Sequence, residues 1–228
     1  MNMIRKLAPR SLVCGIRTAW ILLSKRGQVQ RDEDGNCVDA DGNHLPWMTY
    51  PAIDYLNSLD LSHANVFEFG SGASTLFWKK RCNSVCAIEH YIPWFERMDK
   101  YNNDKVNIIK QPDGGLYPNE IESFGLFDVI SIDGAERSRC AKHAVNHLKS
   151  GGLLILDNSE WYPETATFLR DNGFTQLDFC GFAPLNSFTS MTSIFFKNEI
   201  KFPYLNKKHG WIPIGGKALD SIPADDLN

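Results

Sequence analysis

The sequence predicts an α/β fold: an open, doubly wound and mostly parallel sheet of seven strands, of which the last is antiparallel. Short continuous apolar runs alternate with helix-type segments between residues 65 and 172, as in a parallel sheet covered on both faces. One of these runs ends in the glycine turn Gly70-Ser71-Gly72, where a helix begins. After residue 174, two strand-like runs follow each other with no helix between them, and this reverses the last strand.

The composition predicts a cytoplasmic protein of one domain with extensions, or of at most two small domains. The chain has 228 residues, of which 43% are hydrophobic, and this is enough for a full core. A formal net charge of −3 argues against a dedicated nucleic-acid binder, and no apolar run is long enough to span a membrane. The six cysteines lack paired spacing, which favours reduced thiols in a cytosolic protein.

The sequence divides into an N-terminal segment (1–46), a central domain (47–198) and an irregular C-terminal tail (199–228). The first 31 residues contain seven Lys and Arg side chains and no acid, with apolar residues between them. Such a basic helix with an apolar face would lie on an anionic membrane surface through residues 1–27, which would make the protein peripheral to a membrane. The alternatives are packing on the domain or on a partner subunit, and a transit peptide.

The segment 32–46 is rich in turn residues and predicts a solvated hairpin or linker. Its aspartates have a spacing that resembles a calcium loop, but the ligand set of such a loop is not completed. A helix over 52–58 is predicted next. It follows an aromatic stretch that contains Trp47 and Tyr50.

The central domain contains the alternating pattern of strands and helices. The predicted strands are 65–69, 84–89, 106–110, 127–132, 152–157, 175–180 and 191–197. The predicted helices are 74–81, 92–101, 137–148 and 163–172, and the predicted loops are 111–117 and 181–190. This order predicts parallel strands up to the sixth and a reversed seventh strand.

Polar residues lie at or just after the ends of five predicted strands, where a doubly wound sheet binds its ligands. They are Glu68, Glu89, Asp113, Asp133, and Asp157 with Asn158. Glu89 lies about twenty residues after Gly70, which is the spacing at which a strand-end acid accepts ribose hydroxyls. Asp113 is a candidate partner for the amino group of adenine.

The glycine turn differs from a dinucleotide-binding fingerprint at two positions. Glycines let the backbone come close to a ligand, and the fingerprint has a third glycine three residues after the second. Here that position is Thr75, and Glu68 precedes the turn. An acid beside the turn suits a cationic ligand group and repels a pyrophosphate. A nicotinamide-dependent oxidoreductase on this sheet is therefore an alternative that these two residues disfavour.

Given Glu68, the glycine turn and Glu89, the region of about residues 50–197 resembles the class I S-adenosylmethionine (SAM) methyltransferases, which have a Rossmann-like fold. The runs 47–53, 67–72, 156–159 and 192–196 are also similar to bacterial proteins of uncertain function. The resemblance implies a methyltransferase that acts on a small molecule or on a glycan or lipid intermediate, with oxygen as the favoured acceptor atom. A non-catalytic binding or assembly subunit on the same fold is a second alternative.

The same resemblance implies where SAM binds. Gly70, Ser71 and Gly72 would line the methionine half of the cofactor, and Glu68 would lie near its ammonium group. Glu89 would hold the ribose. Asp133 would lie beside the cofactor as well, at the end of the fourth strand.

A second resemblance concerns a metal. Asp133, Asp157 and Asn158 match the pattern of metal-dependent catechol-type O-methyltransferases, and this implies a Mg²⁺ ion bound by hard oxygen ligands. The catechol-type enzymes have a lysine base three residues after the first Asp, where this chain has Glu136. The alternative is that no metal binds. Asp133 would then orient the substrate directly or cap the helix that follows it, and Asp157-Asn158 would cap the helix after the fifth strand.

Methyl transfer to a hydroxyl requires a general base and a wall that holds the acceptor. The candidate bases are Asp133, Glu136 and His90. The candidate acceptor contacts are Trp47, Tyr50, Asn158 and Trp161, with Tyr162, Phe182, Asn186 and Phe188 in the same parts of the chain.

Overall fold

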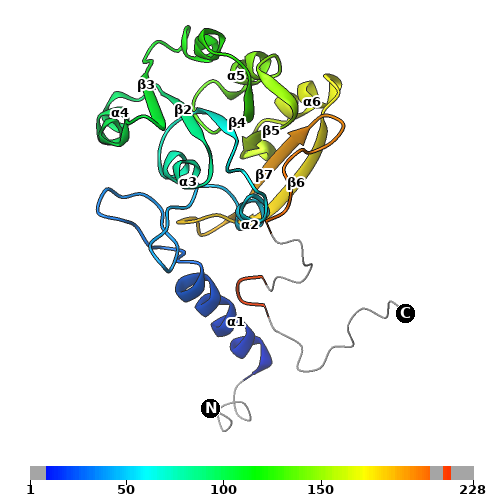
Figure 1. The fold of residues 1–228 in the computed structure, drawn as a ribbon. Helices are drawn as coiled ribbons and strands as arrows, with labels where there is room; N and C mark the ends of the chain where they lie inside the picture. Colours follow the sequence, from blue (N-terminus) through cyan, green and yellow to red (C-terminus); the bar gives the residue numbers. More distant parts are fainter. Residues whose placement is uncertain (1–8, 206–212, 217–228) are drawn as a thin grey trace.

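A computed structural model describes residues 9–205 and 213–216 of the chain. Its centre is a seven-stranded sheet with the order β3-β2-β1-β4-β5-β7-β6 (Figure 1). The strands are β1 (Asn65–Phe69), β2 (Ser84–Glu89), β3 (Val106–Lys110), β4 (Phe127–Ile132), β5 (Leu148–Asp157), β6 (Thr175–Phe182) and β7 (Thr189–Phe196). The pairs from β3 to β5 are parallel, and β7 is antiparallel to both of its neighbours. The predicted fold class is confirmed.

Helices cover both faces of the sheet. The α-helices are α1 (Arg10–Trp20), α2 (Tyr50–Ser58), α3 (Ala73–Arg81), α4 (Ile92–Met98), α5 (Arg137–Ala144) and α6 (Pro163–Asp171). The shorter helices are η2 (Ile21–Lys25), η3 (Asp99–Tyr101), η4 (Tyr117–Ser123) and η5 (Ser159–Trp161). One apolar cluster joins the sheet to α2, α3 and α4, and a second joins the opposite face to η4, α5 and α6. Figure 1 shows α1 standing apart from this body.

The position of Glu68 follows from the alternation of side chains along β1. Val66 packs into the cluster on the α3 face, while Phe67 and Phe69 pack into the opposite one. Successive strand side chains point to opposite faces, so Glu68 lies on the α3 face with Val66. It is therefore buried next to the first turn of that helix, with 1% of its surface exposed.

Two predicted boundaries were wrong by several residues. Helix α5 ends at Ala144 and strand β5 begins at Leu148, where the sequence predicted a helix to 148 and a strand from 152. Leu148 pairs with Phe127 ahead of a register shift, and a bulge of this kind extends a strand beyond its apolar run. The helix η4 was also missed. Its first turn contains Pro118, which is tolerated there because that amide has no helical partner.

The turn-rich segment packs on the domain and is only partly solvated. It forms two antiparallel bridges, Arg31 with Cys37 and Val38 with His44. Cys37 is only 4% exposed and belongs to the core. Asp34 anchors the segment to η3, because its carboxylate accepts hydrogen bonds from side chains of that helix. The predicted hairpin is present, but one side of it is buried.

Candidate active site

The glycine turn after β1 lies against the loop after β4. Gly70 has a φ of +105°, a conformation that L side chains rarely adopt. A Cβ atom on Gly134 would lie 2.9 Å from the backbone nitrogen of Gly70. Both positions therefore need glycine, since the two strand ends touch backbone to backbone. This close approach brings the acids that end β1 and β4 to one edge of the sheet.

Glu68 is held in place by the residue that replaces the third glycine of a dinucleotide fingerprint. The Thr75 hydroxyl donates a hydrogen bond of 2.5 Å to Oε2 of Glu68 and accepts one from the Gly72 N–H. The other carboxyl oxygen, Oε1, has no hydrogen-bond partner among the residues that the structure describes. Burial raises the pKa of Glu68 from 4.5 to about 8. A cationic group beside this oxygen would stabilise the ionised form of the buried carboxyl.

Glu89 closes the glycine turn from the end of β2. Its Oε2 accepts hydrogen bonds from the N–H of Ser71 at 3.0 Å and from the Ser71 hydroxyl at 2.9 Å. Its Oε1 accepts one from the N–H of Tyr91. The predicted spacing of one strand and one helix therefore places this carboxylate beside the turn. Only 4% of Glu89 is exposed.

These residues line a cavity of about 350 Å³, here called the glycine-turn pocket. Its lining is Glu68, Gly70, Ser71, Ser74, Glu89, His90, Tyr91, Trp94, Asp133, Gly134 and Ala135. Five of the seven positions predicted to bind the cofactor contribute to it. Gly72 lines the adjoining cavity, and Asp113 lines neither.

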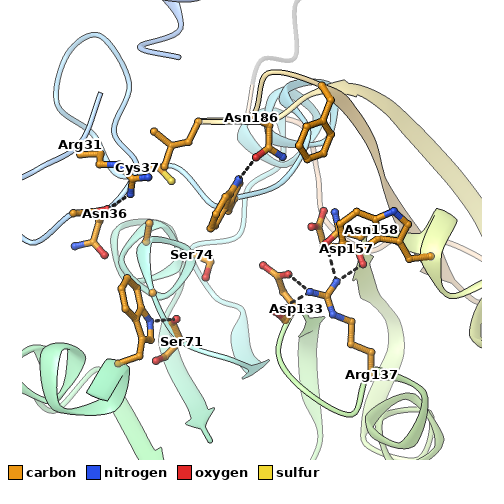
Figure 2. Close-up of a pocket in the computed structure, with 18 residues that line it drawn as sticks. Arg31, Asn36, Cys37, Ser71, Ser74, Asp133, Arg137, Asp157, Asn158 and Asn186 are labelled. Atoms are coloured by element: carbon orange, nitrogen blue, oxygen red, sulfur yellow. Dashed lines mark hydrogen bonds and ion pairs between the residues drawn. The ribbon is translucent and has the colours of Figure 1, made fainter. Parts of the chain in front are cut away.

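The adjoining cavity, here called the aromatic pocket, has a volume of about 470 Å³ (Figure 2). Its walls include Arg31, Asn36, Trp47, Trp94, Arg137, Asp157, Asn158, Trp161, Asn186 and Phe188. Trp47, Trp161 and Phe188 are each at least half exposed, and Nε1 of Trp47 donates a hydrogen bond to Oδ1 of Asn186. The pocket thus combines exposed ring faces with amide groups.

The two pockets meet at four shared residues. They are Ser71, Ser74, Trp94 and Asp133. Nε1 of Trp94 donates a hydrogen bond of 2.6 Å to the carbonyl of Ser71, so its indole is fixed across the glycine turn. A ligand in one pocket and a ligand in the other would therefore come together beside these four residues, which include Asp133.

Arg137 joins the ends of β4 and β5 (Figure 2). Its Nε donates to the carbonyl of Gly134, and one terminal nitrogen donates to Oδ1 of Asp133 at 2.9 Å and to the Asp133 carbonyl at 3.2 Å. The other terminal nitrogen donates to Oδ1 of Asn158 at 3.1 Å and to the carbonyl of Asp157. All five guanidinium N–H groups are thus used within the protein.

The two aspartates beside this guanidinium have raised pKa values. Burial raises the pKa of Asp133, although the charge of Arg137 opposes the rise. Burial and the neighbouring Asp133 raise the pKa of Asp157 well above its usual range. Oδ1 of Asp157 accepts a hydrogen bond of 2.5 Å from the hydroxyl of Thr192. Arg137 thus forms an ion pair with the Asp133 carboxylate and bonds to Asp157 only through its backbone carbonyl.

The three predicted metal ligands do not fit a metal ion in this arrangement. The Arg137 guanidinium is bonded to the Asp133 carboxylate and the Asn158 amide oxygen, which a Mg²⁺ ion would need as ligands. No group of three or more His, Cys, Asp or Glu side chains suited to a metal occurs in 9–205 or 213–216. The predicted Mg²⁺ is therefore unsupported. The capping alternative is also wrong, since α5, η5 and α6 all begin without a side-chain cap.

Three other predicted site residues lie outside both pockets. Glu136, a candidate base, has a left-handed backbone conformation, and its side chain is 45% exposed. Asp113 is exposed and accepts a hydrogen bond from the N–H of Gly115. Tyr50 is a core residue, only 4% exposed. Trp47, Asn158 and Trp161 do line the aromatic pocket, as predicted for acceptor contacts.

The sequence prediction did not include Trp94, Arg137 or Arg31, nor the contribution of the turn-rich segment through Asn36 and Cys37. Trp94 carried a usable signal, because it is an aromatic residue soon after the acid that ends β2. Arg137 carried one as well, since it lies four residues after Asp133 at the start of a predicted helix. The turn-rich segment gave no sign of its position over the pocket.

Comparison with known proteins supports the fold. No family model and no curated protein matches the chain. A precorrin-6y C5,15-methyltransferase from Geobacter metallireducens matches with a TM-score of 0.51 and 13% identity, over 75% of this chain and 95% of that one. An rRNA methylase from Streptococcus thermophilus matches with a TM-score of 0.50 and 15% identity, over 68% and 100%. The chain has the class I methyltransferase fold. At these identities the likeness concerns the fold, so function must be argued from the site.

Proposed function

We propose that this protein is a SAM-dependent methyltransferase that binds SAM in the glycine-turn pocket and its acceptor in the aromatic pocket. The observation that carries the proposal is the meeting of the two pockets at residues that include Asp133, beside the buried carboxyl of Glu68. Methyl transfer needs two ligands held end to end, and two joined cavities of this size provide for that.

The glycine-turn pocket suits SAM in its charge and in its shape. The unpaired Oε1 of Glu68 would receive the ammonium group of the methionine part, which also explains why a carboxyl is buried there. Gly70 and Gly134 let the ends of β1 and β4 meet backbone to backbone, and this holds Glu68 and Asp133 along one wall of the pocket. Glu89 would accept the ribose hydroxyls. When bound, SAM supplies a methyl group already activated on a positively charged sulfur.

The protein's own residues then have two tasks. The aromatic pocket orients the acceptor and shields it from water, and Asp133 takes the proton of an acceptor hydroxyl. Arg137 holds Oδ1 of Asp133 and leaves Oδ2 for the proton. The raised pKa of Asp133 makes this carboxylate a better proton acceptor than an exposed aspartate.

The acceptor that best suits the aromatic pocket is a small molecule or a glycan or lipid intermediate, methylated at oxygen. Trp47 and Trp161 present half-exposed indoles that can stack on a ring, and Asn186 offers an amide beside them. A nucleic acid suits the pocket poorly. One Arg31 nitrogen already donates to the carbonyl of Gly35, and Arg137 is fully engaged.

A binding experiment tests the cofactor. Thermal shift and calorimetry with SAM, S-adenosylhomocysteine and NAD should show stabilisation by the two adenosyl ligands and none by NAD. Glu89→Ala should weaken S-adenosylhomocysteine binding about tenfold or more, since a charged hydrogen-bond partner is lost. Asp113→Ala removes an exposed carboxylate outside both pockets and should leave the affinity unchanged.

The outcomes separate the alternatives. Stabilisation by NAD alone would identify an oxidoreductase, and binding of neither adenosyl ligand would overturn the proposal. Labelled SAM incubated with a cell extract should yield a labelled product whose chemistry identifies the acceptor. Tight adenosyl binding with no labelled product from any extract would indicate a non-catalytic subunit.

A further inference from the structure

The N-terminal helix carries an exposed apolar stripe. Leu12, Ile16, Trp20 and Leu23 follow one another at intervals of four, four and three residues, which is the period of one helix face. Their exposed fractions are 54%, 63%, 52% and 48%. No residue of α1 or η2 is buried. A row of four large apolar side chains in water is unfavourable, so the stripe calls for a partner surface.

The charges around the stripe have one sign. Residues 9–25 contain Arg10, Arg17 and Lys25 and no acid. By helix geometry Arg10 and Arg17 lie to the side of the stripe, where long side chains can extend past the apolar surface toward a polar layer. Nζ of Lys25 lies 5.2 Å from the centroid of the Trp20 ring, so the indole has a cation at its edge. Cations flanking an apolar face complement an anionic surface.

The base of the helix is firmly attached to the domain. Arg26 forms a two-pronged ion pair with Asp54 of α2, at 2.6 and 2.7 Å. Gln28 donates from its side chain to the carbonyls of Ala183 and Asn186, and its own carbonyl accepts from the N–H of Leu185. Leu185 and Asn186 also line the aromatic pocket. The helix is therefore tied to the loop that forms one wall of that pocket (Figure 1).

We propose that α1 and η2 dock this protein on an anionic lipid bilayer. The apolar stripe would enter the boundary between headgroups and acyl chains, and Arg10, Arg17 and Lys25 would contact the anionic headgroups. The helix would lie in the plane of the surface, because its exposed apolar side chains form one stripe along its length. No described helix is long and apolar enough to cross a membrane. Because Gln28 ties its base to the aromatic pocket, docking would bring that pocket close to the lipid.

Charge favours a lipid surface over a second copy of the chain. Two copies packed through their stripes would bring the cations of both helices together with no acid between them in residues 9–25. An anionic bilayer offsets those charges instead. The proposal does not depend on the proposed methyl transfer, because its observations concern only the helix and its attachment.

Sedimentation of the full chain with lipid vesicles tests the proposal. The protein should pellet with vesicles of phosphatidylcholine containing phosphatidylglycerol, pellet much less with phosphatidylcholine alone, and be released by added salt. The variant Leu12→Gln/Ile16→Gln/Trp20→Gln should reduce vesicle binding about tenfold or more, because the apolar contact is lost. The control Ser11→Gln/Thr18→Gln changes exposed polar positions and should bind as the wild type does.

Each of the other outcomes overturns the proposal. They are wild-type protein that stays in the supernatant, a stripe variant that pellets as well as the control, and equal binding to both kinds of vesicle. Light scattering adds a further case: a dimer that the stripe variant dissociates, with no vesicle binding by the wild type, would assign the stripe to a second copy. Circular dichroism and Tm of each variant check that the domain is folded, since all five positions are exposed.

Discussion

Replacing Glu68 with glutamine should remove a pH dependence of stability that this buried carboxyl causes. Glu68 is 1% exposed and its Oε1 is unpaired in the described residues, so its ionised form is poorly solvated. Burial raises its pKa from 4.5 to about 8, although the neighbouring polar side chains of Ser74 and Thr75 oppose the rise. The carboxyl therefore keeps its proton at neutral pH.

The sign and size of the effect follow from this pKa. The folded protein binds the proton of Glu68 more tightly than the unfolded chain does, so the free energy of unfolding falls as pH rises from 4.5 to about 8. At about 1.4 kcal/mol for each tenfold change in proton affinity, the fall is at most about 5 kcal/mol. Glutamine has nearly the same shape and does not ionise. Glu68→Gln should therefore lack this contribution and exceed the wild type in stability above pH 8.

Urea unfolding followed by tryptophan fluorescence measures this difference. Curves for the wild type and Glu68→Gln, recorded from about pH 5 to about pH 9, should diverge steadily as pH rises. Parallel stability profiles for the two proteins would refute the reasoning, because they would show that Glu68 ionises in the folded state as it does in water.

The same variant tests the role of Glu68 in binding. S-adenosylhomocysteine should bind the wild type more tightly as pH rises toward about 8, since the ionised carboxylate is the form that receives an ammonium group. Glu68→Gln should bind more weakly and lose this dependence. Titration of the ligand's own ammonium would affect both proteins alike. Equal slopes would therefore show that Glu68 does not face that group.

Three further predictions test the rest of the site. Arg137→Ala should lower the free energy of unfolding by about 3–5 kcal/mol, because it leaves the neighbouring acids without their cation. Mg²⁺ or EDTA should leave the wild-type Tm unchanged. A Tm that rises with Mg²⁺ would contradict this prediction. Trp94→Ala should weaken S-adenosylhomocysteine binding about tenfold, because Trp94 lines both pockets. Trp161 lines only the aromatic pocket, so Trp161→Ala should leave this affinity unchanged. Equal losses of affinity in calorimetry would argue against two separate pockets. Gly134→Ala should lower Tm strongly, because its Cβ would lie 2.9 Å from backbone atoms of the glycine turn, whereas Gly114→Ala meets no atom within 4 Å and should not.

The sequence alone was sufficient for the fold class and for one edge of the site. Apolar runs and helical segments alternate along the chain, and periodicity of this kind is a local property that can be read directly. In a parallel sheet the strand ends meet at one edge, so Glu68, Glu89 and Asp133 could be expected to come together. Thr75 in place of a glycine argued from the sequence against a dinucleotide fingerprint. The structure adds that its hydroxyl bonds to Glu68.

Tertiary structure decided what completes that edge. Asp133, Asp157 and Asn158 read as metal ligands in sequence, yet Arg137 from the first turn of α5 reaches back over two strand ends and bonds to all three residues. The turn-rich segment likewise forms a wall of the aromatic pocket, and Asp34 holds it there through hydrogen bonds from α4 and η3. Both outcomes depend on which side chains long-range packing brings within hydrogen-bond distance. Local propensity and strand order determine the edge of the sheet where a site forms, but packing determines which charges fill it.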